Sequence, residues 1–133
     1  MKYLIDTKIC IYIMNQRPPD VINKFKNFEV GDIGVSSITV AELQYGVEKS
    51  GHPRMNQGRL DAFIAPFDIV GFDQSAASAY GGIRFQLEMQ GRPIGPLDLL
   101  IAAQALAGEL ILVTNNEKEF KRIEGLKVQN WAN

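Results

Sequence analysis

The stretch KYLIDTKICIYIMN, residues 2–15, sets the expected fold of this chain. Residues 2–6 form a short apolar run that ends on Asp6, and this pattern predicts a buried strand. Apolar residues recur at positions 9, 11, 12 and 13, which predicts a short helix that the Arg-Pro-Pro sequence at 17–19 ends. A strand therefore passes directly into a helix, with an acid at the junction.

The rest of the chain repeats this alternation without a linker or an internal repeat. Further strands are predicted at residues 33–35, 67–72 and 110–113. Helices are predicted between them: one capped by Asp20, one capped by Ser36, Ser37 or Thr39, one before Pro66, one at 74–90 after Asp73, and one at 97–107. Alternating strands and helices predict an α/β fold with a central parallel sheet.

Composition limits the classes of protein that remain. A chain of 133 residues with 46% hydrophobic and 22% charged side chains is typical of one globular domain. The net charge of -1 gives no global signal for nucleic-acid binding. Cys10 is the single cysteine, which excludes an internal disulfide and a cysteine zinc cluster. No signal-like segment or membrane-length apolar run is present, so a cytoplasmic location with no membrane anchor is expected.

Acids and amides follow several of the apolar runs. The residues concerned are Asp6, Glu42, Asp98, Asn116 and Glu119. A buried ionised carboxylate is costly without a partner, and a divalent cation is the simplest partner that distant acids can share. Ligands of open parallel sheets bind beyond the carboxyl ends of the strands, where Asp6 and residues 114–119 are expected. Hard oxygen ligands of this kind favour Mg²⁺ or Mn²⁺.

Other reactive residues have simpler interpretations. His52 is alone in a Gly-His-Pro loop and is expected to be solvated, while Cys10 is expected to fill space in the core. A phosphoacceptor signalling domain is a rival small α/β protein that also binds Mg²⁺. It requires a second acid beside the first, whereas Ile5 precedes Asp6, and Asp73 is expected to cap a helix.

Four ordered motifs span nearly the whole chain. They are LIDTKICIYIMN at 4–15, SSITVAELQYGVEKS at 36–50, GRPIGPLDLLIAAQALA at 91–107 and LVTNNEKEFKRIEGLKVQNW at 112–131. Together they resemble the VapC-type toxins of VapBC toxin–antitoxin systems, which are PIN-domain ribonucleases. The resemblance implies a single PIN domain over residues 1–133, a three-layer α/β/α fold with a central parallel sheet of four to five short strands.

The resemblance also implies function. Its activity would be Mg²⁺- or Mn²⁺-dependent endonucleolytic cleavage of RNA, with tRNA as the target. Its partners would be a cognate VapB-type antitoxin that inhibits it and a second copy of the chain, in a homodimer and a toxin–antitoxin hetero-oligomer. A basic antitoxin side chain that reaches the acids would replace the charge of the metal.

Site residues are transferred by matching positions. Asp6, Glu42 and Asp98 match the acidic metal-site positions of the family, and Glu119 matches its more variable fourth acid. Asn116 lies where other PIN domains often place an Asp. The implied roles are metal ligation by Asp6 and Asp98, ligation by Glu42 directly or through water, and orientation of the attacking water or completion of a second metal site by Glu119. Mutual repulsion predicts that at least one acid has a raised pKa without metal.

Two residues depart from the family pattern. Lys8 replaces a usual Asn, and one hypothesis is that it pairs with Asp6 or Glu42 and competes with the metal. The chain would then be a weakened or silent PIN domain that acts as an antitoxin-binding module. The alternative is that Lys8 points to solvent or to a phosphate and is harmless. Gln104 replaces a His found in many relatives, and its distance along the helix from Asp98 predicts that it is not a metal ligand.

Substrate and antitoxin contacts have only candidate residues. Candidates for contact with the RNA are Thr7, Lys8, Arg84, Arg92, Lys118, Lys121 and Arg122, and the alternative for each cation is a solvated surface. Apolar residues that could line an antitoxin groove are Ile11, Tyr12, Ile13, Met14, Phe25 and Phe28. The alternative is ordinary core packing, which is favoured for Ile11 and Phe25.

Overall fold

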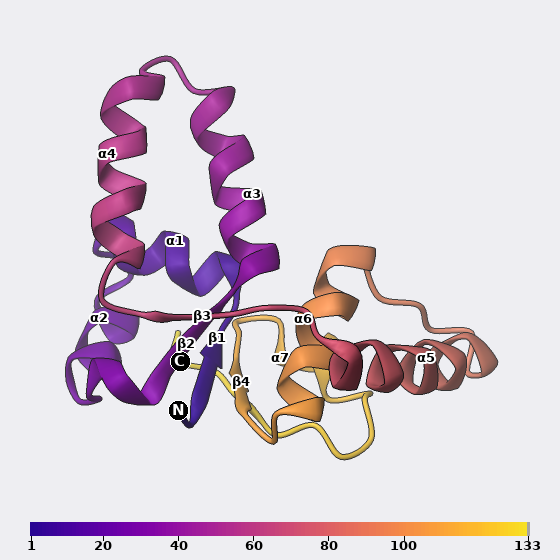
Figure 1. The fold of residues 1–133 in the computed structure, drawn as a ribbon. Helices are drawn as coiled ribbons and strands as arrows, with labels where there is room; N and C mark the ends of the chain where they lie inside the picture. Colours follow the sequence, from indigo (N-terminus) through magenta and orange to yellow (C-terminus); the bar gives the residue numbers. More distant parts are fainter. Residues whose placement is uncertain (133) are drawn as a thin grey trace.

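Five short parallel strands form one sheet in the order β3-β2-β1-β4-β5 in the computed structural model, which describes residues 1–132 (Figure 1). The strands are β1 (Tyr3–Ile5), β2 (Ile33–Ser36), β3 (Asp68–Val70), β4 (Ile111–Val113) and β5 (Val128–Gln129). β1 lies at the centre, where Tyr3 is in register with Ile33 of β2 and Ile111 of β4. The chain order reverses between β1 and β4, so a ligand crevice is expected beyond the carboxyl ends of these two strands.

Helices cover both faces of the sheet. They are α1 (Thr7–Asn15), α2 (Pro19–Lys26), α3 (Ser37–Glu48), α4 (Pro53–Ile64), α5 (Gln74–Met89), α6 (Pro96–Ala107) and α7 (Glu117–Phe120), with a short 3-10 turn at Val30–Asp32. In Figure 1, α3 and α4 form a hairpin that stands away from the sheet, and α5 and α6 lie on the other side of the molecule. Within residues 1–132, no helix combines the length and the apolar character that a membrane span needs.

The central strand shows why both faces are covered. Tyr3 and Ile5 of β1 are buried in one apolar cluster with α1 to α4, whereas Leu4 is buried in a second cluster with α5, α6 and Phe120. Successive strand residues point to opposite faces, and both faces are dry here. A continuous apolar run is therefore needed in β1, and the predicted three-layer α/β/α fold with its parallel sheet is confirmed.

Capping explains several helix starts and corrects one of the expectations. Asp73 accepts a hydrogen bond from the Ala76 N–H at 2.9 Å, as predicted. The start of α3 is capped by Ser36, whose hydroxyl accepts from the Ile38 N–H, so Thr39 is not the cap. Asp20 is not a cap either, because α2 begins after Pro18 and Asp20 lies within its first turn. An acid there still interacts favourably with the helix dipole.

The carboxy-terminal elements were not expected from the sequence. α7 has only one turn and β5 has two residues, so neither is long enough to show a periodic pattern. Packing holds them: the ring of Trp131 stacks on Phe28 with centroids 4.8 Å apart and meets the edge of Tyr3 at 5.9 Å. This contact packs the chain end that follows β5 against one apolar cluster, while the buried Phe120 anchors α7 in the other.

Candidate active site

Asp6 is the most buried of the predicted acids. It follows β1 directly, its N–H donates to the Val113 carbonyl at 3.0 Å, and its carboxylate caps α1 by accepting from the Ile9 N–H at 2.9 Å. The pKa of Asp6 is raised from 3.8 to about 6, mainly by burial and to a smaller extent by the nearby charges of Asp98 and Glu42, while hydrogen bonds from Thr114 and Ile9 oppose the rise. A helix start therefore holds a carboxyl group that gives up its proton reluctantly.

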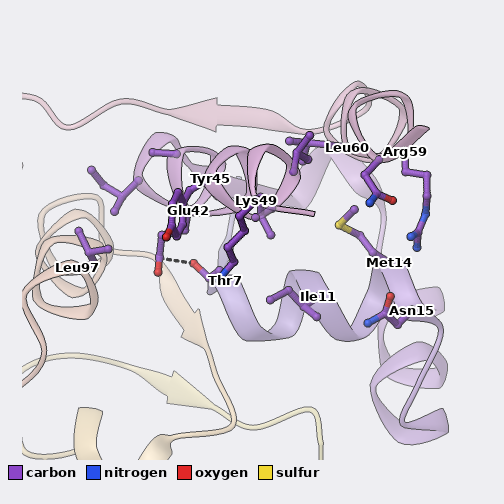
Figure 2. A pocket seen from close by; sticks show the side chains of 16 residues that line it. Thr7, Ile11, Met14, Asn15, Glu42, Tyr45, Lys49, Arg59, Leu60 and Leu97 are labelled. Carbon is purple, nitrogen blue, oxygen red and sulfur yellow. Dashed lines mark hydrogen bonds between the residues drawn. The ribbon is translucent and has the colours of Figure 1, made fainter. Parts of the chain in front are cut away.

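Glu42 lies in the second turn of α3 and faces α1. The Thr7 hydroxyl donates to its Oε1 at 2.7 Å (Figure 2). The same hydroxyl is 3.0 Å from the hydroxyl of Thr39. Thr39 lies one helical turn before Glu42, so the two side chains share a face. Thr39 was not predicted as a site residue, although its position three residues before Glu42 on a helix could have indicated that it lies beside this acid. The predicted contact residue Thr7 is thus engaged with the acid.

Asp98 enters the site from the other layer. It is the third residue of α6, after a proline at the first position, and its side chain is half-buried. Burial raises the pKa of Asp98, and the charges of Glu119 and Glu42 raise it further. A raised pKa for at least one acid in the metal-free chain is confirmed. Its main cause is burial, not the mutual repulsion from which the sequence argument started.

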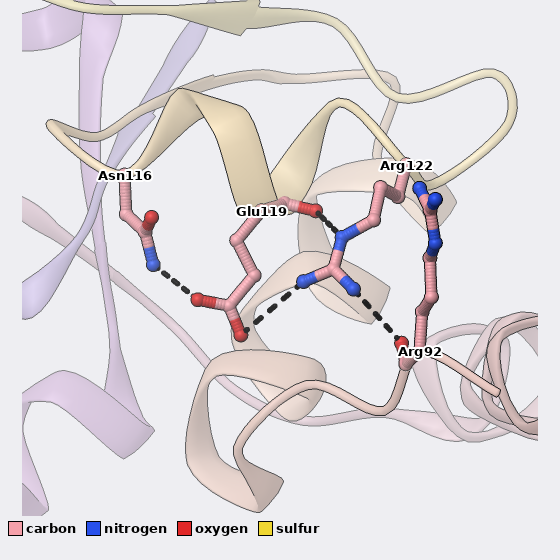
Figure 3. A network of polar contacts seen from close by, with 4 residues as sticks. All are labelled: Arg92, Asn116, Glu119 and Arg122. Carbon is pink, nitrogen blue, oxygen red and sulfur yellow. Dashed lines mark hydrogen bonds and ion pairs between the residues drawn. The ribbon is translucent and has the colours of Figure 1, made fainter.

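Glu119 and Asn116 belong to one polar network on α7 (Figure 3). The Asn116 amide donates to Glu119 Oε2, and Arg122 pairs with Glu119 Oε1 at 3.8 Å. Arg122 also donates to the Glu119 carbonyl and to the Arg92 carbonyl, each at 3.2 Å. Asn116 therefore lies beside the fourth acid, and the side chain of Arg122 is directed into this network.

The four acids come together from four separate segments. Asp6 follows β1, Glu42 is on α3, Asp98 is on α6 and Glu119 is on α7, and their charges influence one another through the pKa values of Asp6 and Asp98. Among residues 1–132, however, no three His, Cys, Asp or Glu side chains already form a metal-binding group. The reason is visible in the partners: Glu42 is turned to Thr7, and Glu119 is turned to Asn116 and Arg122.

The donor set fits a hard divalent cation. Its members are carboxylates, and two of them have raised pKa values that a nearby dication would lower. The side chains of Glu42 and Glu119 end in rotatable bonds, so both can exchange their present hydrogen bonds for a cation. Thr114, which directly follows β4, donates a hydrogen bond to the Asp6 carboxylate. Residues 114–119 were predicted to lie at the site, but no role was predicted for Thr114.

The remaining predicted residues are at the surface or in the core. Lys8 is exposed and forms no ion pair with any residue from 1 to 132, so the predicted pairing with Asp6 or Glu42 is not observed. Arg84 pairs with Glu88 on α5, and Lys121 pairs with Glu117. Other exposed cations are Arg92 and Lys118. The positions of these side chains do not show whether they contact RNA, so their role in RNA binding stays a prediction.

Gln104, Cys10 and His52 behave as expected. Gln104 is only 2% exposed; it accepts from the Ser36 hydroxyl and donates to the Val70 carbonyl at 3.0 Å. It therefore ties α6 to β2 and β3, consistent with the prediction that it is not a metal ligand. Cys10 is fully buried in the core and His52 is exposed.

An apolar groove of about 840 Å³ lies beside Glu42, between α1, α3 and α4 (Figure 2). Thr7 and Glu42 line it, together with Ile11 and Met14. Ile11 is 40% exposed, so the prediction that it is a core residue is wrong: it lies on the face of α1 turned away from the sheet.

The other groove candidates pack inward. Ile13 is buried, Phe25 and Phe28 pack against the core, and Tyr12 accepts from the Asn115 amide at 2.9 Å while packing on the same core. The core prediction for Phe25 is confirmed. Only Ile11 and Met14 of the six predicted residues line the groove.

Comparisons with known proteins agree with this geometry. The PIN domain family profile matches residues 3–126. The chain is 41% identical over 132 residues to the tRNA(fMet)-specific endonuclease VapC of Shigella flexneri, covering 99% of each chain. It is 45% identical over 132 residues to the ribonuclease VapC2 of Rickettsia felis, covering 98% of each.

Solved structures show the same relationship. The structure of VapBC2 from Rickettsia felis bound to a promoter DNA fragment matches with a TM-score of 0.89 and 42% identity, covering 98% of this chain and 99% of that one. The DNA-bound VapBC of Salmonella typhimurium matches with a TM-score of 0.92 and 37% identity, covering 98% of each chain. Both similarities extend over nearly the whole fold.

Proposed function

Because the chain belongs to the PIN-domain family, and within it to the VapC ribonucleases of toxin–antitoxin systems, we propose that it is a metal-dependent endoribonuclease that cleaves tRNA. The observation that carries this proposal is the convergence of Asp6, Glu42, Asp98 and Glu119 at the carboxyl ends of β1 and β4. These acids come from four segments that are far apart in sequence. A divalent cation is a shared partner that would offset the repulsion among them.

The roles of the residues follow from their positions. Asp6 and Asp98 are the core ligands for Mg²⁺ or Mn²⁺, since both carboxyl groups have raised pKa values and each is affected by the charges of neighbouring acids, which a dication would offset. Glu42 joins directly or through a water when it releases Thr7, and Glu119 orients the attacking water or completes a second site. The bound cation would acidify a water and offset the charge that develops on the scissile phosphate. The proposed reaction needs no nucleophilic side chain.

The proposed substrate is tRNA(fMet), because two curated relatives are named for that specificity. These are the VapC proteins of Shigella flexneri and Salmonella typhimurium, 41% and 37% identical to this chain over 132 residues. Exposed cations near the acids, Lys8 on α1 and Lys118 on α7, offer contacts for the phosphate backbone. Proposed RNA contacts also include Thr7, Arg84, Arg92 and Lys121.

The test is cleavage of purified tRNA by the isolated chain. We expect discrete fragments from tRNA(fMet) and none from an elongator tRNA, in Mg²⁺ or Mn²⁺. EDTA and Asp98→Asn should each abolish cleavage. Asp68→Asn is the matched control, because Asp68 is an exposed acid on β3 away from the acid cluster, and it should cleave normally. Cleavage that survives EDTA or Asp98→Asn would refute the metal-dependent mechanism.

The effect of Lys8 distinguishes two hypotheses: an active ribonuclease and a catalytically silent module that binds the antitoxin. Its side chain is exposed and unpaired among residues 1–132, so direct neutralisation of Asp6 or Glu42 gains no support from the geometry. We expect the unmodified chain to cleave and Lys8→Asn to change its metal affinity by less than about three-fold, as for one exposed charge in salt. No cleavage by the wild type and restored cleavage by Lys8→Asn would instead establish a switched-off copy.

A VapB-type antitoxin is the proposed partner, since solved relatives are VapBC complexes. The apolar groove beside Glu42 suits a helical or extended antitoxin segment, with Ile11 and Met14 as contacts. A basic side chain from that segment would inhibit the enzyme by replacing the cation. We further propose a homodimer, its hetero-oligomer with the antitoxin, and a cytoplasmic location.

A further inference from the structure

Arg122 occupies an unusual position for a surface arginine. Only 25% of its side chain is exposed, as is 26% of its ion-pair partner Glu119. All three guanidinium nitrogens are engaged: one pairs with the Glu119 carboxylate, and the others donate to the carbonyls of Glu119 and Arg92 (Figure 3). The Arg122 carbonyl in turn accepts from Gln86 of α5 at 3.2 Å. Each nitrogen of the guanidinium thus has a partner within the protein, and these contacts set its orientation.

These contacts join the two segments that present acids from one side of the site. Arg92 lies at the start of the loop that leads into α6 and Asp98, while Glu119 lies on α7. Arg122 binds both segments, and the planar fork of a guanidinium fixes the two carbonyls relative to each other. The charge of Glu119 reaches Asp98, whose pKa it helps to raise. A change at Arg122 is therefore transmitted to both acids.

We propose that Arg122 is a positioning residue with two separable effects: its fork sets Glu119 relative to the Asp98 loop, and its charge is the counter-ion that Glu119 gives up when a divalent cation binds. This inference rests on the proposed function and assigns Arg122 a role other than phosphate contact. The two effects act in opposite directions. Loss of the charge leaves the acids more negative, which favours a dication, whereas loss of the fork lets Glu119 drift and slows the reaction.

Two substitutions separate these effects. Arg122→Gln removes the charge and most of the fork, so we expect the protein to bind Mn²⁺ about five-fold more tightly, as for one unit charge acting on a dication under water-like screening. Its cleavage rate at saturating metal should nevertheless fall at least ten-fold. Arg122→Lys keeps the charge but lacks the fork, so it should bind Mn²⁺ as the wild type does and still cleave slowly.

The experiment is calorimetric titration of Mn²⁺ into the full chain without RNA, followed by tRNA cleavage at saturating Mn²⁺. Lys127→Met is the matched control; it removes one exposed charge at the amino end of β5, whereas the acids lie at the carboxyl ends of the strands, and it should leave both values unchanged. A merely structural role would weaken metal binding and cleavage together in Arg122→Gln. That outcome, or no change in either, overturns the proposal.

The proposed function can fail separately from this inference. Absence of Mn²⁺ binding and of cleavage in the wild type overturns both. If the wild type binds Mn²⁺ and cleaves tRNA, and Arg122→Gln has the same Mn²⁺ affinity and cleavage rate, the ribonuclease proposal stands and the role of Arg122 is refuted. Arg122→Lys keeps the test informative if the glutamine variant folds poorly, because a wild-type affinity with a wild-type rate in that variant refutes the fork.

Discussion

Asp6→Asn should make the metal-free protein more stable while it removes a proposed metal ligand. The asparagine has the same shape, and its Oδ1 can still accept from the Ile9 N–H to cap α1. What disappears is a buried charge. Because burial raises the pKa of Asp6 from 3.8 to about 6, the folded chain holds the proton more tightly than the unfolded chain does. Ionisation of Asp6 therefore destabilises the fold.

The direction and the size of the change in the free energy of unfolding follow from the pKa of Asp6. The free energy of unfolding is highest below pH 4, falls as the pH rises from about 4 to about 6, and stays low above it. The full difference at pH 7.5 is about 3 kcal/mol, from about 1.4 kcal/mol per pKa unit. That pKa already contains the favourable interactions of the charged carboxylate at the start of α1, so the helix dipole is not subtracted a second time. The expected net gain is therefore about 3 kcal/mol, or roughly 10 °C in Tm for a chain of this size.

Urea and thermal unfolding in EDTA measure this gain. We expect it at pH 7.5 and expect it to fall by half or more at pH 5.0, where much of the wild-type Asp6 is protonated. Asp73→Asn is the matched control, since Asp73 also caps a helix through a backbone N–H at 2.9 Å but is exposed and outside the acid cluster. Mg²⁺ should raise the Tm of the wild type and not that of Asp6→Asn. A variant no more stable than the wild type at pH 7.5, or a gain equal to that of the control, refutes this reasoning.

Three further changes test other parts of the structure. Gln104→Leu leaves the Ser36 hydroxyl and the Val70 carbonyl without their partner, so it should lower the free energy of unfolding by about 2–4 kcal/mol in urea; a loss under 1 kcal/mol would show that the network contributes little. Trp131→Ala empties a fully buried site against Phe28 and should cost about 3–5 kcal/mol by the same assay, which a stable variant would contradict. Met14→Asp puts a charge in the apolar groove and should abolish co-purification with the co-expressed antitoxin without lowering tRNA cleavage; unchanged co-purification would place the antitoxin elsewhere.

Local patterns were sufficient for most of the fold. The apolar run ending on Asp6 predicts β1, and the Arg-Pro-Pro sequence after it predicts the end of α1, because both signals lie within a few residues of the element they define. The same holds for the cap at Asp73. Patterns fail where an element is too short to have a period, as in α7 and β5, or where several residues compete for one role, as Ser36 and Thr39 do at the start of α3.

The acids were identifiable because a charged residue at the edge of an apolar run stands out, and because four motifs occur in the family order. What each acid contacts was not identifiable. The Thr7–Glu42 bond joins residues 35 positions apart, and Arg122 reaches the loop carbonyl of Arg92 across 30 positions. Such pairings depend on how helices pack across the sheet, and a local pattern holds no information about them.

The α/β alternation, the family and the four candidate acids can be predicted from the sequence alone, since each of these is encoded in residues that are close together or in motifs of fixed order. The exposure of Ile11 to a groove and the contacts by which Gln104 joins α6 to β2 and β3 depend on helix packing, which no local pattern encodes. The absence of an ion pair between Lys8 and the acids among residues 1–132, and burial as the main cause of the raised pKa of Asp6, likewise follow only from the folded chain. Burial and long-range contact are properties of the packed chain, because each depends on residues that only folding brings together.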